Sequence, residues 1–297
     1  MSRDEPSLPS DIPSSSAEAR PFPSAWQPLT PRGVAAFSRA TLGRLFLVQF
    51  IVALLVAGSV IWFLATVWFP ITREAIRQLP DTGLIQNQQL SSPRPTPEPL
   101  VENRFLAFLV NVEGASTPNL AADLRIEFYR RHFALCSILG CLRLDYPKDS
   151  TVQFNRPELE SWWAAWELTI YSAVGIAIVA GLFASWVLLA TLYCPVARFY
   201  AFFKDRQLTA LGSWKLAAAA LLPGALLMAA GIGLYGLELI DLFQLLIIWV
   251  LHLILGWVYV FVSPLRLPRV ADSPTVPRNP FGKPKPASVN PFSPENK

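Results

Sequence analysis

The sequence predicts an α-helical integral membrane protein with four transmembrane helices and a small β-rich extracytoplasmic domain between helices one and two. Of its 297 residues, 53% are hydrophobic and only 15% are charged, whereas an average soluble domain carries about 25% charged residues. The apolar excess lies in four uncharged stretches, residues 45–69, 168–194, 216–237 and 242–265. Each stretch is long enough to cross a hydrocarbon core of about 30 Å as a helix. A single soluble globular domain is therefore excluded.

The boundaries follow from charges and prolines beside these stretches. We expect helix one at residues 44–70, helix two at 161–196, and helices three and four within 216–265. Residues 197–215 are expected to form a cytoplasmic loop. The tails, 1–43 and 266–297, are rich in proline and are expected to be disordered and cytoplasmic. Pro223 should kink the third helix, because proline removes a helical hydrogen bond.

Basic residues near the spans set the orientation. Arg32, Arg39 and Arg44 precede the first span, and further basic residues follow the second and the fourth span. In the link between the third and fourth spans, the only charged residues are acidic. By the positive-inside rule, both termini are predicted to be cytoplasmic and residues 71–160 to lie outside. The net charge of +4 then reflects topology, and nucleic-acid binding is not expected.

The outer segment alternates apolar and polar residues over short runs. Residues 124–128, 133–139 and 142–146 show this alternation, and residues 105–112 form a more buried apolar run. Together they predict an antiparallel unit of about four strands, with a turn at Gly140 and a helix over 71–79. Cys136 and Cys141 flank that turn, so they form either a disulfide or two buried free thiols on neighbouring strands. Only His132 lies near them, so no metal site is predicted.

Few residues in the spans carry chemistry. His252 is a candidate intramembrane polar site, although a histidine bonded between helices explains it as well. Three carboxylates, Glu167, Glu238 and Asp241, fall at the outer span ends and form either an acidic rim or ordinary interfacial side chains. The sequence has no Ser/His/Asp constellation, glycine-rich phosphate loop or HExxH motif. We therefore predict neither enzymatic activity nor a cofactor.

Small residues recur every four positions in two spans, which is typical of helices whose backbones approach closely in lipid. In the second span they are Ala173, Ala177, Gly181 and Ser185, and in the third Ala225, Ala229 and Gly233. Both strips are expected to pack against neighbouring helices.

Three segments carry a resemblance to a known family: residues 37–44 before the first span, residues 76–90, and the apolar strand 105–111. Together they resemble a bacterial inner-membrane family of unknown function, sometimes labelled maltodextrin-utilisation-associated, with four spans and one extracytoplasmic domain. The similarity covers most of residues 37–265. Asn111-Val112-Glu113 replaces the family's usual acidic position. The resemblance implies the same architecture and no catalytic residues.

Three functions remain open. The first is an envelope protein that binds, senses or assembles through its outer domain, with the lipid bilayer and other proteins as partners. The second is a transporter component, for which Gln49, Gln244 and His252 offer a sparse polar path. The third is a eukaryotic trafficking adaptor, because Asn-Pro-Phe occurs at 279–281 and 290–292.

Overall fold

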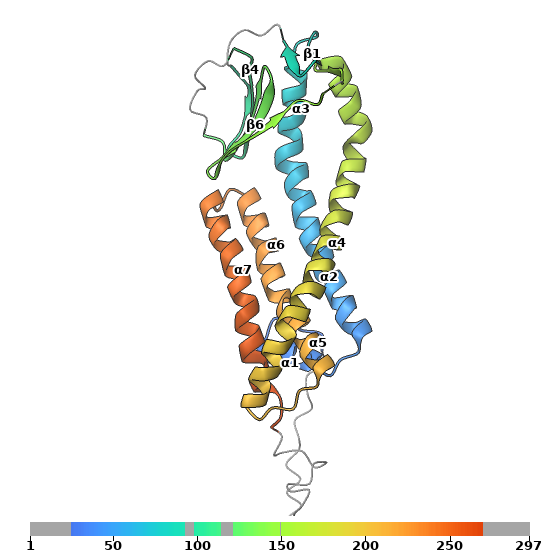
Figure 1. The fold of residues 1–297 in the computed structure, drawn as a ribbon, viewed down its shortest axis with the longest axis vertical. Helices are drawn as coiled ribbons and strands as arrows, with labels where there is room; N and C mark the ends of the chain where they lie inside the picture. The colour runs from blue at the N-terminus through green and yellow to red at the C-terminus, as the bar shows by residue number, and fades with distance from the viewer. Residues whose placement is uncertain (1–24, 93–97, 114–120, 149, 270–297) are drawn as a thin grey trace, which may run out of the picture.

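The computed structural model describes residues 25–92, 98–113, 121–148 and 150–269. A helical bundle carries a β domain at one end, above the outer ends of the two shorter helices α6 and α7 (Figure 1). Four helical segments are long and apolar enough to cross a membrane: Leu42–Arg77, Arg156–Phe203, Ala210–Gly236 and Leu242–Arg266. The prediction of four such helices with a β region between the first two is confirmed.

The first segment continues beyond the predicted boundary at residue 70. Helix α2 (Leu42–Phe63) begins at Thr41, whose side chain accepts a hydrogen bond from the amide of Arg44. A π-helical turn, η1 (Leu64–Trp68), then joins it to α3 (Phe69–Arg77). Pro70 explains the wide turn, because its ring crowds the preceding turn and it has no N–H to donate. The helix therefore extends beyond the bundle through α3. We call α3, together with the outer part of α4 (Arg156–Phe203) that packs beside it, the stalk.

Helix α4 (Arg156–Phe203) has 48 residues and measures about 72 Å, so the predicted limits of 161 and 196 were too narrow. Asn155 caps its first turn. Pro195 does not end it, because buried Ala190 and Ala197 on either side of the proline both belong to the inner core. Its outer part lies beside α3 and completes the stalk.

Helix α5 (Ala210–Ala220) and helix α6 (Leu222–Gly236) form the third segment and are separated at Leu221, next to Pro223. Helix α7 (Leu242–Val262) ends in a 3-10 turn, η2 (Ser263–Arg266). The predicted loop 197–215 is therefore mostly helical, since α4 runs to Phe203 and α5 starts at Ala210.

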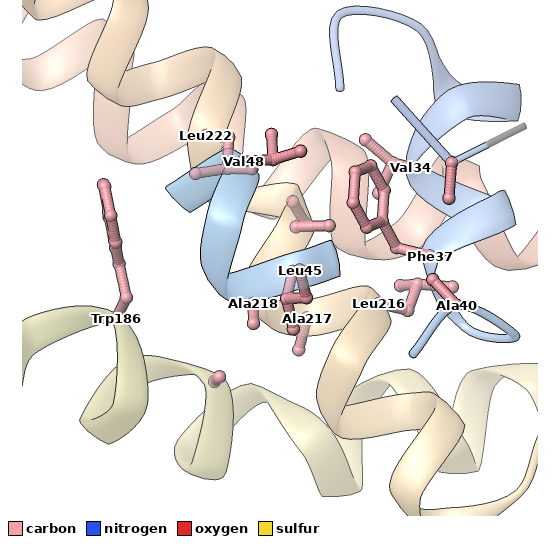
Figure 2. Close-up of a cluster of buried hydrophobic side chains, with 14 of the residues drawn as sticks. Val34, Phe37, Ala40, Leu45, Val48, Trp186, Leu216, Ala217, Ala218 and Leu222 are labelled. Atoms are coloured by element: carbon pink, nitrogen blue, oxygen red, sulfur yellow. The ribbon is translucent and has the colours of Figure 1, made fainter. Parts of the chain in front are cut away.

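The inner end of the bundle holds the main core. Helix α1 (Pro31–Phe37) lies at the inner end of the bundle with Val34 and Phe37 fully buried. Both belong to a core cluster that also holds side chains of α2, α4, α5 and α6 (Figure 2). Lys215 is also buried here, and its Nζ donates to the carbonyl of Ala40 at 2.6 Å. The expectation of disorder was therefore wrong for residues 25–43, because α1 and the alanines on either side of it, Ala25 and Ala40, are buried in the core.

The other predicted tail also begins in an ordered segment. The backbone of Arg206 bridges Arg269, and the amide of Gln207 donates to the carbonyl of Pro268 at 3.2 Å. Residues 266–269 are therefore held against the end of α4, contrary to the expectation for 266–297. Residues 1–24 and 270–297, with both Asn-Pro-Phe motifs, lie outside the described residues.

The strands between Leu84 and Gln153 form a domain beyond the ends of α6 and α7, which we call the outer domain (Figure 1). It contains two sheets. A small sheet has the order β2-β1-β8, and a larger one the order β3-β4-β5-β6-β7. The strands are β1 (Leu84–Gln86), β2 (Gln89–Ser91), β3 (Glu98–Glu102), β4 (Leu106–Asn111), β5 (Leu124–Tyr129), β6 (His132–Ser137), β7 (Gly140–Asp145) and β8 (Val152–Gln153). The prediction of a purely antiparallel unit of about four strands was wrong, because β4 and β5 are parallel. The 12 residues between them, 112–123, are enough for the crossover that a parallel pair needs.

Two tyrosines tie the larger sheet together. The hydroxyl of Tyr146 donates to the carbonyl of Tyr129 at 2.8 Å, and the Tyr129 hydroxyl donates to the buried carboxylate of Glu127 at 2.6 Å. Burial, followed by the bond to Glu127, raises the pKa of Tyr129 to about 12. Burial also raises the pKa of Tyr146. Both rings are therefore favoured as neutral phenols in the folded domain.

We expect the outer domain to lose stability as the pH rises from about 10, where an unfolded tyrosine titrates, through the folded pKa of Tyr129, about 12. Raised folded values mean that the unfolded state releases its protons first. For Tyr129 the loss should not exceed about 1 kcal/mol, because the ring is partly exposed. Denaturant titrations at pH 8 and pH 11 measure it, and Tyr129→Phe should reduce the difference. An unchanged difference in the variant would contradict the assignment.

Candidate functional site

A mostly apolar pocket lies where the outer domain meets the bundle. Its volume is about 360 Å³, within the range of about 300–1,000 Å³ that is usual for ligand sites. Its walls come from α2 and η1, the starts of β4 and β5, the β6–β7 turn, and the outer ends of α6 and α7. The lining residues are Val60, Phe63, Trp68, Phe105, Asp123, Leu124, Ser137, Ile138, Leu139, Ile232, Tyr235, Leu242, Leu245 and Leu246. We call it the junction pocket.

Three aromatic rings form the floor of the junction pocket. Phe63 of α2 stacks on Tyr235 of α6 with centroids 5.5 Å apart, and Phe105 meets Tyr235 edge-on at 4.8 Å. Phe63 and Phe105 also meet edge-on, at 5.7 Å. All three side chains are buried. Such pairs add to the energy of apolar burial, so the outer domain is packed directly on the helical bundle.

Polar contacts from two further residues fix the same junction. The Tyr235 hydroxyl donates to Oδ2 of Asp123 at 2.7 Å. Arg104 donates from Nη1 to the carbonyl of Glu238 and from Nη2 to that of Ile240, both at 3.2 Å. These two carbonyls lie in the turn between α6 and α7. We call Arg104, Asp123 and Tyr235 the latch.

The lining of the junction pocket contains few polar side chains. The indole N–H of Trp68 is buried and has no hydrogen-bond partner among the described residues, and a buried donor without a partner costs about 1–3 kcal/mol. Asp123 is the only charged residue that the described part of the chain contributes to the lining, and its carboxylate already accepts the Tyr235 hydroxyl. The pocket therefore suits a mostly apolar ligand whose head group carries no negative charge.

His252 lines a second, smaller cavity of about 130 Å³ within the helices. Its neighbours there include Ser185 and Tyr193, and most of the other lining side chains are apolar. The polar groups bond within their own helices: Nδ1 of His252 contacts the carbonyl of Trp249, and the Ser185 hydroxyl donates to that of Leu182 at 2.8 Å. Of the other predicted path residues, Gln49 is buried in α2 and Gln244 caps α7.

The predicted acidic rim does not assemble. Glu167 pairs with Arg73 of α3 across the stalk. Asp241 caps α7 by accepting the amide of Gln244 at 2.7 Å, and Glu238 contributes its backbone carbonyl to Arg104. Over the described ranges, no group of three or more His, Cys, Asp or Glu side chains is arranged to hold a metal ion. Each of the three residues therefore serves a separate, local contact.

The two outer cysteines are joined. Cys136 of β6 and Cys141 of β7 form a disulfide, with Cα atoms 4.1 Å apart, across directly paired positions of the hairpin. Of the two interpretations left open by the sequence, the structure has the bonded one. The disulfide lies next to the Ile138–Leu139 turn, which lines the junction pocket.

The predicted small-residue strip of the second span lies on the wrong face. Ala173, Ala177 and Gly181 are exposed and Ser185 is half-buried, because the inner face of α4 instead carries Trp186, Ala190 and Ala197. In α6, Ala225 is buried and Ala229 packs on the core, but a Cβ at Gly233 would meet nothing within 4 Å.

Other glycines make the close approaches. A Cβ at Gly224 would lie 2.6 Å from the carbonyl oxygen of His252, and one at Gly236 would lie 2.8 Å from the Trp62 ring. These positions bring α6 against α7 and α2. Spacing alone did not distinguish them, because alanine and glycine are frequent throughout the span.

The latch and Trp68 were missed by the sequence reasoning. One signal was available: the turn before Gly140 is Ile138-Leu139, whereas turns normally hold glycine, proline or polar residues. An apolar turn in an outer domain indicates a contact surface. Arg104, Asp123 and Tyr235 carry no comparable signal, since a single Arg, Asp or Tyr is ordinary at the end of a strand or helix.

The comparisons with known proteins found no matching family model, no similar curated protein and no similar solved structure.

Proposed function

We propose that this protein is an envelope membrane protein that binds a neutral amphipathic ligand in the junction pocket and so senses it on the outer side of the membrane. The observation that carries the proposal is the pocket itself, an apolar space between the outer domain and the helices with Asp123 in its lining. The ligand's chain packs on the apolar walls, and its head group carries no negative charge beside Asp123.

The construction of the junction supports sensing rather than simple storage. Its walls come from the outer domain and from three membrane helices, which are held together by the latch. A ligand that contacts both parts binds their docked arrangement more tightly than the separated one. Ligand binding therefore shifts the population toward the docked state, by an amount set by its differential affinity.

Photolabelling tests this function. The protein in phospholipid nanodiscs is mixed with a diazirine-bearing monoacylglycerol, which is neutral and has an ester carbonyl, and labelled peptides are mapped by mass spectrometry. We expect labels on peptides containing Phe63, Tyr235 or Leu245. The matching diazirine fatty acid, which is anionic at pH 7, should label these peptides several-fold less because of Asp123.

A filled pocket provides the control. Val60→Trp places a large side chain in the lining, and we expect it to reduce labelling at least fivefold. Leu55→Trp makes the same change on an exposed part of α2 and should leave labelling unchanged. Equal labelling of Val60→Trp and the unsubstituted protein would overturn the proposal.

The proposal includes an orientation of the protein in the membrane, which the basic residues and the disulfide support. The start of α2, which holds Arg44, and the end of α4, which holds Arg198, lie at the end of the bundle opposite the outer domain (Figure 1). The positive-inside rule places this end in the cytoplasm. A disulfide in the outer domain fits an oxidising compartment outside it. We therefore propose that the protein lies in the inner membrane of a bacterium, with both termini in the cytoplasm and lipid as a partner.

The other functions stay predictions. The cavity at His252 is the one observation that favours transport, and its lining is mostly apolar. The trafficking motifs lie outside the described residues. The absence of enzymatic activity and the family resemblance are likewise predictions.

A further inference from the structure

The turn between β6 and β7 exposes two large apolar side chains. Ser137 pairs with Gly140, so Ile138 and Leu139 alone form the turn, and they are 59% and 82% exposed. Gly140 allows this tight connection because its φ is +118°, a value that side chains disfavour. Leu142, on the following strand, is exposed as well. In water such a tip would leave an apolar patch uncovered.

The tip lies at the depth of a candidate membrane span. Ile138 and Leu139 line the junction pocket together with Leu242, Leu245 and Leu246, which form the first turns of α7. The apolar window of the fourth candidate span lies in this same segment, Leu242–Arg266. The tip is therefore level with the outer end of the hydrocarbon-spanning part of α7.

Exposed tryptophans on the stalk lie farther out than the tip. A Cβ at Gly175 of α4 would contact Ile61 of α2, and one at Gly236 of α6 would contact the neighbouring Trp62. Gly175 and Gly236 therefore lie at about the same level along the bundle. This level is close to that of the tip, because Tyr235 lines the junction pocket together with Ile138 and Leu139. Trp166 is nine residues before Gly175 and therefore about 13 Å farther out along α4. Its ring is 48% exposed. Tryptophan rings favour the headgroup layer, which places the tip below the outer edge of that layer.

The opposite end of the same strands has the reverse character. Arg130 and Arg131 form the turn between β5 and β6, and both are exposed. This turn lies at the far end of β6, about 20 Å from the tip for a six-residue strand. The sheet thus has a basic end that faces water and an apolar end beside the helices.

We propose that the Ile138–Leu139 tip inserts into the outer leaflet of the membrane that the helices span, as a separate attachment of the outer domain. The partner is the lipid at the boundary between headgroups and chains. This attachment requires no ligand in the junction pocket, so it holds or fails independently of the proposed function.

Site-specific photocrosslinking tests the insertion. p-Benzoylphenylalanine replaces Leu139 in one variant and Arg131 in another, each in the full chain in nanodiscs of a single phospholipid. We expect phospholipid adducts at position 139 at least tenfold more abundant than at position 131. Comparable adducts at both positions, or crosslinks from 139 mainly to a second copy of the chain, would overturn the proposal.

Hydroxyl-radical footprinting of the unsubstituted protein gives a second readout that does not depend on a variant folding. Leu139 is 82% exposed in the protein, against 39% for Val152 of the outer domain. In nanodiscs we expect Leu139 to be oxidised at least fivefold more slowly than Val152, because lipid excludes the radical's aqueous source. Faster oxidation of Leu139 would show that the tip is in water.

Discussion

Replacement of Gly224 by leucine is expected to cause the largest loss of stability of any single change discussed for the helices. A Cβ at this position would lie 2.6 Å from the carbonyl oxygen and 3.4 Å from the carbonyl carbon of His252. Both atoms belong to the backbone of α7, which cannot rotate away as a side chain does. Overpacking of this kind typically costs about 1–3 kcal/mol, and sometimes more, and small residues are what allow such approaches in lipid.

Gly181→Leu is the matched control. A Cβ there meets nothing within 4 Å, and leucine favours a helix over glycine by several tenths of a kcal/mol or more. We expect the control to unfold at the same denaturant concentration as the unsubstituted protein or a slightly higher one, and Gly224→Leu at a distinctly lower one. Titration with a denaturing detergent, followed by tryptophan fluorescence, measures both. Equal transitions for the two variants would refute the contact between α6 and α7.

Arg104→Ala is expected to release the outer domain from the turn between α6 and α7. The substitution removes both hydrogen bonds to the carbonyls of Glu238 and Ile240. A hydrogen bond from a charged donor contributes about 1.5–3 kcal/mol. Because these two bonds of Arg104 are partly exposed to solvent, we expect them to contribute about 2 kcal/mol together. A loss of about 2 kcal/mol makes local opening about 30-fold more frequent.

Hydrogen exchange in nanodiscs measures this opening. Amides of residues 237–242 and of 103–106 should exchange about 30-fold faster in Arg104→Ala, whereas those of β6 should not change. Arg131→Ala, at the exposed far end of the sheet, should leave all of them unchanged. Tyr235→Phe removes only the bond to Asp123 and should give a smaller acceleration. Identical exchange in Arg104→Ala and Arg131→Ala is the outcome that excludes the latch.

The features that were predictable from the sequence are local ones. The four long apolar helices follow from uninterrupted apolar length, because a chain in lipid must satisfy its own backbone. Three strands of the larger sheet, β5, β6 and β7, were expected from their period of two, and β4 from its continuous apolar run. The break beside Pro223 was expected from its missing N–H.

The junction depended on contacts between distant parts of the chain. Arg104 and Glu238 are 134 residues apart, and Asp123 and Tyr235 are 112 residues apart. The parallel pairing of β4 with β5 brings residues 104 and 123 to the same end of the sheet, which an antiparallel pairing of these two strands would not do. The erroneous strand pairing therefore also concealed the site.

The sequence by itself determined where apolar segments begin and end, which of them have the length of a membrane span, and which side of the membrane the charges favour. These properties depend on neighbouring residues and on the solvent. The tertiary structure decided which face of α4 is buried, which glycines bring helices together, and that the apolar Ile138–Leu139 turn lines one pocket with α7. Those outcomes depend on the pairing of surfaces far apart in the chain, and many pairings satisfy the same local pattern until the whole chain is packed.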